Sequence, residues 1–131
     1  TGHLVLATLH TTGAAKSIDR IVDVFPGSEK DMIRTMLSES LIAVISQTLI
    51  KTADGKNRVA VIISCAATPA IKNLIRENKI AQMNSSIQTG AAFGMQTLDQ
   101  ALNNLVRQGI ITEAAAKDKS SSPGNISKNP T

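Results

Sequence analysis

A short, uninterrupted apolar run near the start of the chain, LVLATL at residues 4–9, most constrains the fold. Such a run is typical of a strand that is covered on both faces, as in the parallel sheets of α/β proteins. A short polar turn then leads into AAKSIDRIVDVF, whose apolar residues recur with helical spacing up to Pro26 and Gly27. We therefore predict an interior strand, a tight turn and a helix capped by Thr11 or Thr12.

The next segment predicts a long amphipathic helix followed by a β-hairpin. Ser28 and Asp31 have the spacing of a capping box. The apolar residues that follow at helical spacing are Met32, Ile33, Met36, Leu37, Leu41, Val44 and Ile45. Residues 45–51 and 59–65 flank the turn-rich segment TADGKNR, which indicates two antiparallel strands joined by a turn.

The second half of the chain predicts helices. Thr68 and Pro69 mark a helix start, and Ile71, Leu74 and Ile75 then share one face. Further helices are expected in IAQMNSSIQ, in MQTLDQALNNLVRQG and around TEAAAK, with a flexible TGAAFG between the first two. In the second of these the apolar stripe consists of Leu98, Ala101, Leu102, Leu105 and Val106, and Gly109 supplies the C-cap.

These patterns divide the chain into three parts. Residues 1–66 form an α/β unit with a hairpin, and residues 67–119 form a helical region. Residues 120–131 are rich in Ser, Pro, Gly and Asn and have little to bury, so we expect them to be disordered.

Composition excludes several classes of protein. No apolar run reaches the length of about 18 residues that a membrane-spanning helix needs, so at most peripheral membrane association is expected. Cys65, the only cysteine, lies in an apolar run and is expected to be a buried, inert thiol in a reducing compartment. The net charge of +4 suits an anionic partner, but two Phe and no Tyr or Trp give single-stranded nucleic acid almost nothing to stack on. No nucleic-acid partner is expected.

Two histidines flank the apolar run. If the residues between His3 and His10 are extended, the two Cα atoms lie roughly 23 Å apart and the side chains face opposite ways, so they share no metal ion. His10 follows the carboxyl end of the predicted strand and precedes a helix, where open α/β sheets bind ligands and where a residue that senses a phosphate belongs. His3 has no such argument. The chain contains no GxxxxGK[ST] phosphate loop, so alone it should not hydrolyse ATP.

Several motifs together resemble one family. TGHLVLATLHT resembles the His box, and AAKSIDRIVDVFP the segment after it, of PilT-like ATPases, the type IV pilus retraction motors of the secretion ATPase superfamily. AIKNLIREN resembles their AIRNLIRE motif, and IQTGAAFGMQTLDQAL their C-terminal helical region. The match runs from Thr1 to about Thr112, with the motifs in the family's order.

The resemblance implies a fold and a function. It implies the C-terminal part of a RecA-like P-loop ATPase domain with a β-hairpin, followed by a C-terminal helical region. The Walker A and Walker B elements would lie upstream, and ATP and Mg²⁺ would be bound mainly by residues outside this chain. His3 and His10 would serve catalysis near the terminal phosphate, in a homo-hexamer with nucleotide sites between subunits. The resemblance also implies a cytoplasmic location at the inner membrane, with the pilus platform proteins as partners.

The AIRNLIRE-like motif is implied to act in retraction or partner contact. Its residues are Ala70, Ile71, Lys72, Asn73, Leu74, Ile75, Arg76 and Glu77. On a helix, Lys72, Arg76 and Lys79 form a basic stripe, which is either a solvated face or a surface for an acidic partner.

Three functions follow as hypotheses. The first is a motor that drives pilus retraction and twitching motility by ATP hydrolysis. The others are a pilus extension or type II secretion assembly ATPase, and a non-hydrolysing paralogue that acts as an interaction module.

Overall fold

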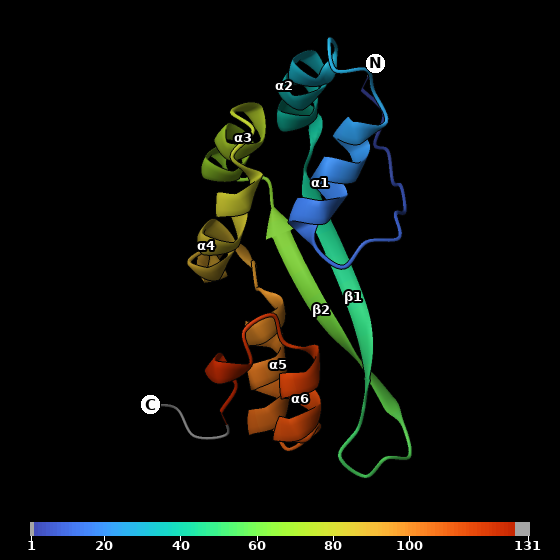
Figure 1. The fold of residues 1–131 in the computed structure, drawn as a ribbon, viewed down its shortest axis with the longest axis vertical. Helices are drawn as coiled ribbons and strands as arrows, with labels where there is room; N and C mark the ends of the chain where they lie inside the picture. The colour runs from blue at the N-terminus through green and yellow to red at the C-terminus, as the bar shows by residue number, and fades with distance from the viewer. Residues whose placement is uncertain (1, 128–131) are drawn as a thin grey trace.

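A long two-stranded hairpin organises the computed structural model, which describes residues 2–127. Strands β1 (Ala43–Lys51) and β2 (Arg58–Ala66) pair antiparallel, with Ala43 opposite Ala66 at one end and Lys51 opposite Arg58 at the other. Figure 1 shows helices beside both ends of this hairpin. The hairpin predicted from the sequence is confirmed.

Helices surround the end of the hairpin that is remote from its turn. They are α1 (Ala14–Asp23), α2 (Lys30–Ser40), α3 (Pro69–Arg76) and α4 (Met83–Gln88), the last preceded by a 3-10 turn at Ile80–Gln82. Their apolar core is made of Ala14, Ile18, Cys65, Ile71, Ile75, Ile80, Met83, Ile87 and Met95. This core contains residues from both sides of the predicted boundary at residue 66. The boundary itself remains a prediction.

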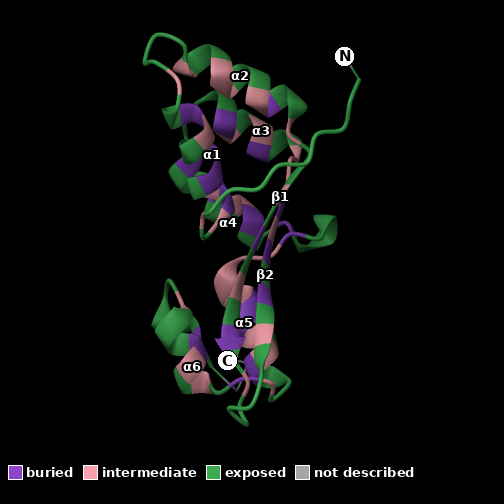
Figure 2. Ribbon diagram, turned by 90° about the vertical axis from the view of Figure 1, so that its right-hand side faces the viewer, coloured by how far each residue is buried: buried purple, intermediate pink, exposed green. Residues whose placement is uncertain are grey.

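A second core lies at the turn end of the hairpin. Helix α5 (Leu98–Arg107) packs there against β2, and helix α6 (Glu113–Lys119) packs against α5. The buried residues are Ile50, Val61, Ala101, Leu102, Val106, Ile111, Ala116 and Ile126. Figure 2 shows buried residues on the helices beside both ends of the hairpin, whereas one face of the hairpin stays open.

Local signals predicted α3 and α5 correctly. Thr68 caps α3 by accepting a hydrogen bond from the Ile71 N–H, and Pro69 stands in the first turn. Thr97 and Gln100 form a capping box at the start of α5. Gly109, at a φ of 72°, terminates α5, and this left-handed conformation favours glycine. No helix between residues 2 and 127 is both long and apolar enough to cross a membrane.

The predicted strand at 4–9 is absent. Residues 2–10 are exposed and without regular structure, and Figure 1 shows them running along the outer side of α1. Leu6 is 88% exposed. A strand forms only beside a partner, and within residues 2–127 both strands pair with each other and leave the 4–9 segment unpaired.

The second predicted helix is shorter than expected. It ends at Ser40, and Val44 and Ile45 belong to β1, opposite Cys65 and Ser64. Ile42, Val44 and Ile45 are β-branched residues, which favour strands, and the backbone of β1 pairs with β2. This pairing outweighs the helical spacing of the apolar residues, so the helix ends before them.

Two predicted helix caps and the disordered tail also differ from the structure. Neither Thr11 nor Thr12 caps α1, whose N-cap is Gly13, and α2 begins after Glu29 without the capping box of Ser28 and Asp31. Residues 120–127 pack against α5 because Ile126 enters the second core and polar groups pair across the contact. The pairs join Ser120 to Asp99, at 2.6 Å, and Asn103 to Asn125, at 3.0 Å. The rest of the predicted disordered tail, 128–131, lies outside the described residues.

Cys65 is buried on β2, and burial raises the pKa of its thiol to about 11. At pH 8 about one thiol in a thousand is then ionised, against about a quarter of thiols with an ordinary pKa. We expect alkylation of Cys65 by iodoacetamide to be at least about 100-fold slower in the folded protein than in urea. Mass spectrometry of timed samples measures both rates, and equal rates would show that this core opens freely.

Candidate functional site

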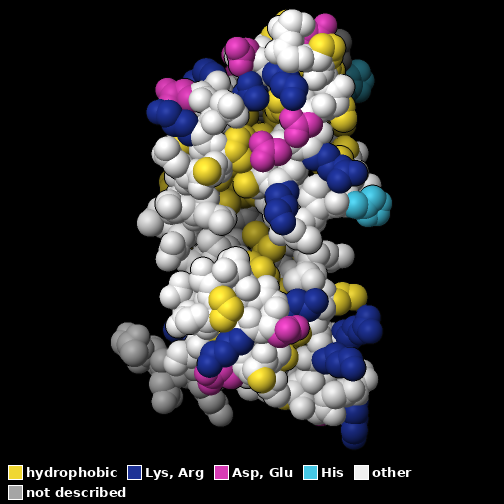
Figure 3. Space-filling model, in the orientation of Figure 1, with side chains coloured by type: hydrophobic (Ala, Val, Ile, Leu, Met, Phe, Trp, Pro, Cys, Tyr) yellow, Lys and Arg dark blue, Asp and Glu magenta, His cyan; other side chains and the backbone are white. Residues whose placement is uncertain are grey.

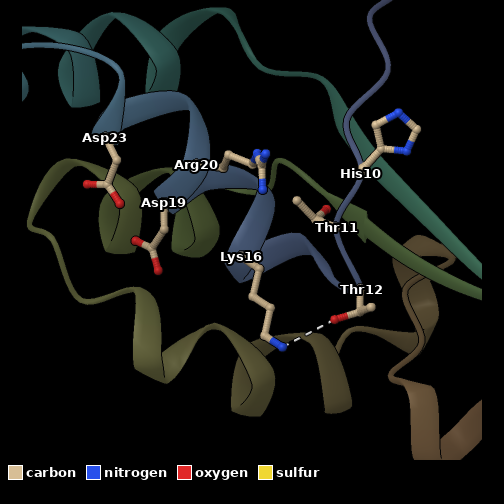
Figure 4. A pocket seen from close by; sticks show the side chains of 7 residues that line it. All are labelled: His10, Thr11, Thr12, Lys16, Asp19, Arg20 and Asp23. Carbon is tan, nitrogen blue, oxygen red and sulfur yellow. Dashed lines mark hydrogen bonds between the residues drawn. The ribbon is translucent and has the colours of Figure 1, made fainter.

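An open cleft of about 400 Å³ lies between the loop that ends the exposed N-terminal segment and the outer face of α1. Its lining residues are His10, Thr11, Thr12, Lys16, Asp19, Arg20 and Asp23. Figure 4 shows Lys16 and Arg20 on the side of α1 that carries the three loop residues, and Asp19 and Asp23 on the other side of the helix.

Hydrogen bonds tie the loop to the helix. The hydroxyl of Ser17, a buried residue, donates to the Gly13 carbonyl oxygen at 2.9 Å. The Thr11 hydroxyl lies 2.5 Å from Ser17 Oγ and can donate to it, because the Ser17 proton is already engaged. Lys16 Nζ donates to Thr12 Oγ1 at 3.2 Å, as the dashed line in Figure 4 shows. These contacts fix the backbone that carries His10.

His10 is exposed and lines the cleft just ahead of α1, as predicted, but the strand whose carboxyl end it was predicted to follow is absent. Figure 4 shows its imidazole pointing away from α1, whereas Lys16 and Arg20 extend from the helix toward the loop. His3 is exposed and is not among the residues that line the cleft. The two histidines are therefore not brought together at this site.

Charged residues of α1 line the cleft and were not singled out from the sequence. Lys16 and Arg20 supply positive charge, and Asp19 and Asp23 supply negative charge. Asp23 pairs with Lys30 at 3.1 Å. The spacing of these residues, three to four apart on one helix, was the signal that could have identified them once the loop before α1 was considered.

The donors of the cleft suit an anionic oxygen. The hydroxyl of Thr12, the ammonium of Lys16 and the guanidinium of Arg20 are the groups that bind phosphate oxygens in proteins. Between residues 2 and 127 no three His, Cys, Asp or Glu side chains are grouped so that they could hold a metal ion. Thr12, Lys16 and Arg20 thus offer donors to an anionic oxygen, beside the carboxylates of Asp19 and Asp23 on the same helix.

The AIRNLIRE-like motif divides into a buried and an exposed half on α3. Ile71 and Ile75 are fully buried, and Leu74 and Lys72 are half-buried. The exposed residues are Ala70, Asn73, Arg76 and Glu77. Lys79 Nζ lies 3.0 Å from Glu77 Oε2, and this contact lowers the pKa of the Glu77 carboxyl. The sequence-predicted basic stripe is therefore partly neutralised at Lys79.

Comparison with known proteins identifies the family. The family described as Type II/IV secretion system protein matches residues 1–128. The chain belongs to this family. The resemblance to PilT-like ATPases inferred from the motifs is confirmed by the most similar relatives.

Two relatives match almost the whole chain. A twitching motility protein of Neisseria gonorrhoeae is 62% identical over 127 residues, which cover 97% of this chain and 34% of the relative. The type IV pilus retraction ATPase PilT of Pseudomonas aeruginosa is 61% identical over 126 residues, which cover 96% of this chain and 36% of the relative. The chain thus spans about a third of the length of these relatives.

A solved structure has the same fold. The crystal structure of the pilus retraction motor PilT with bound ADP matches with a TM-score of 0.82 at 42% sequence identity, over 95% of this chain and 34% of that one. The predicted fold class, α/β with a β-hairpin followed by a helical region, is thereby confirmed.

Proposed function

We propose that the chain is the C-terminal part of a RecA-like motor ATPase that drives type IV pilus retraction and twitching motility. The observation that carries this proposal is the identity of 62% and 61%, over nearly the whole chain, with a twitching motility protein and a pilus retraction ATPase. The cleft at His10 supports it, because its donors suit the phosphates of a nucleotide.

In this proposal ATP and Mg²⁺ are bound mainly by residues outside this chain, and bound Mg²⁺ would neutralise charge on the phosphates. His10 hydrogen-bonds the terminal phosphate or the attacking water. Thr12, Lys16 and Arg20 add donors and positive charge on the α1 side of the cleft, and His3 is a second catalytic candidate on the resemblance alone. The 131 residues alone are inactive in hydrolysis, since they contain no phosphate loop.

The proposed assembly is a homo-hexamer in the cytoplasm. It lies at the cytoplasmic face of the inner membrane, where its partners are the pilus platform proteins. In such an assembly each nucleotide lies between neighbouring subunits, so hydrolysis changes how the subunits sit against each other. The exposed residues of the AIRNLIRE-like motif, together with the half-buried Lys72, serve in retraction through contact with a partner. No nucleic acid takes part.

Substitution of Lys72 and Arg76 tests the proposed role of α3 in pilus retraction. In the full-length protein, Lys72→Gln together with Arg76→Gln is expected to reduce twitching about tenfold, because an acidic partner loses two charged contacts. ATP hydrolysis should stay within about twofold of the unchanged protein, since both side chains lie on α3 outside the cleft. Twitching zones and phosphate release measure the two effects.

A matched control removes two other exposed positive charges, with Arg107→Gln on α5 and Lys119→Gln on α6. This variant should twitch normally. Equal loss of hydrolysis and twitching in the α3 variant would indicate a folding or assembly defect and would remove the support for a partner contact.

A further inference from the structure

Three cations stand at the turn end of the hairpin. Lys51, Lys56 and Arg58 are exposed, and no carboxylate of residues 2–127 forms an ion pair with any of them. Figure 3 shows Lys and Arg side chains gathered at the lower right, where Figure 1 places this end of the hairpin.

Two of these cations are direct cross-strand neighbours. Lys51 of β1 pairs in register with Arg58 of β2. Like charges in directly opposite positions destabilise a sheet, so this pair works against the stability of the hairpin. The turn itself is held in place, because the Ala53 N–H donates to the Ile110 carbonyl oxygen at 2.8 Å. The backbone thus holds the two residues opposite each other.

The pair lies on the open face of the hairpin. Along β1 the exposed residues alternate and include Leu49 and Lys51, and on β2 they include Arg58 and Ala60. Leu49 is 53% exposed and lies opposite Ala60. Lys51, Arg58, Leu49 and Ala60 therefore form one surface, the hairpin-end surface, with two cations followed by two apolar residues.

The turn beside this surface carries a negative charge. Asp54 accepts hydrogen bonds from the Thr52 hydroxyl at 2.5 Å and from the Lys56 N–H at 2.9 Å. These bonds lower the pKa of the Asp54 carboxyl, which is charged at neutral pH. The turn end thus carries the Asp54 carboxylate beside the exposed Lys56, whereas the open face carries Lys51 and Arg58, with which no carboxylate of residues 2–127 forms an ion pair. An acidic segment that lies on the open face contacts these two cations.

We propose that the hairpin-end surface binds an acidic segment of a partner protein, with carboxylates against the two cations and an aliphatic side chain against the apolar pair. The guanidinium of Arg58 can take one carboxylate in a two-point contact, and the ammonium of Lys51 takes a second as a point charge. The repulsion between the two cations in the free protein is then relieved on binding. This inference holds whether or not the full-length protein hydrolyses ATP.

The test uses the full-length protein and a fluorescein-labelled peptide of sequence Glu-Leu-Glu-Glu-Leu-Glu. Lys51→Gln together with Arg58→Gln is expected to weaken binding of this peptide at least about tenfold, as measured by fluorescence anisotropy. The same double change is expected to raise the melting temperature by about 1–2 °C, because it removes the like-charge pair. Weaker binding in a more stable protein distinguishes a binding role from damage to the fold.

Matched controls define the outcomes. Arg107→Gln with Lys119→Gln removes the same charge elsewhere and should change binding less than about twofold. A peptide with Gln in place of Glu should not bind. Equal weakening in both double variants, or none in either, would overturn the proposal. Tighter retention on phosphatidylglycerol vesicles or duplex DNA than on the peptide, dependent on Lys51 and Arg58, would overturn it in favour of a membrane or nucleic acid.

Discussion

Replacing His10 by alanine in the full-length protein is expected to lower the rate of ATP hydrolysis about 100-fold. In the nucleotide-bound full-length protein the imidazole would turn toward the phosphate, and loss of one such hydrogen-bond donor costs about 2.7 kcal/mol in the activation barrier. Nucleotide affinity should change less than about threefold, because the neighbouring donors of the cleft remain. Phosphate release under saturating ATP measures the rate, and titration with a fluorescent ADP analogue measures the affinity.

Two further variants sharpen this result. Gln108→Ala changes an exposed residue just beyond α5 and should leave hydrolysis unaltered. His3→Ala examines the role that only the family resemblance implies, since His3 does not line the cleft. Unchanged hydrolysis in the His10 variant would end its proposed role, and a parallel loss of hydrolysis and nucleotide binding would assign His10 to binding.

The second large effect is on stability. Ile71→Ala is expected to lower the free energy of unfolding by about 2–5 kcal/mol, the cost of a cavity at a fully buried aliphatic side chain. Ile71 is fully buried and belongs to the core that joins α1, α3 and α4. A domain is stable by only about 5–15 kcal/mol, so this one change would remove a large share of its stability. Urea unfolding followed by far-ultraviolet circular dichroism measures the difference.

Asn73→Ala is the matched control, because Asn73 lies on the same helix but is exposed. Its effect should stay within about 0.5 kcal/mol. If the two variants unfold alike, the core around α3 is not as tightly packed as the burial of Ile71 indicates. The pair also separates the buried half of the AIRNLIRE-like motif, which holds the fold, from the exposed half proposed to meet a partner.

Features that depend on a few neighbouring residues could be predicted from the sequence. The start of α3 at Thr68 and Pro69, the hairpin and the end of α5 at Gly109 each rest on local chemistry. The prediction of a strand at 4–9 was wrong because a strand forms only beside a partner strand, which the local sequence does not reveal. The prediction that Val44 belongs to a helix was wrong for a related reason. Val44 pairs with Cys65, which is distant in the sequence, and the spacing of neighbouring apolar residues does not reveal that pairing.

The candidate site followed the same rule. His10 could be placed from its position ahead of a helix. Lys16 and Arg20 became part of the cleft only through the way the loop folds back along α1, which depends on the contacts of Thr11 and Thr12 with that helix. A distant contact such as that between Ser120 and Asp99 left no local signal, so the packing of residues 120–127 was missed.

The hairpin contributes to both cores, with Cys65 in one and Val61 and Ile50 in the other. Nine paired residues on each strand give a rod about 30 Å long. If the hairpin moves as one rigid body, a tilt of about 5° at the α1 end would carry the α5 end through about 2.6 Å. A small rotation near the cleft would then reach the far end of the molecule as a displacement comparable to a hydrogen-bond length.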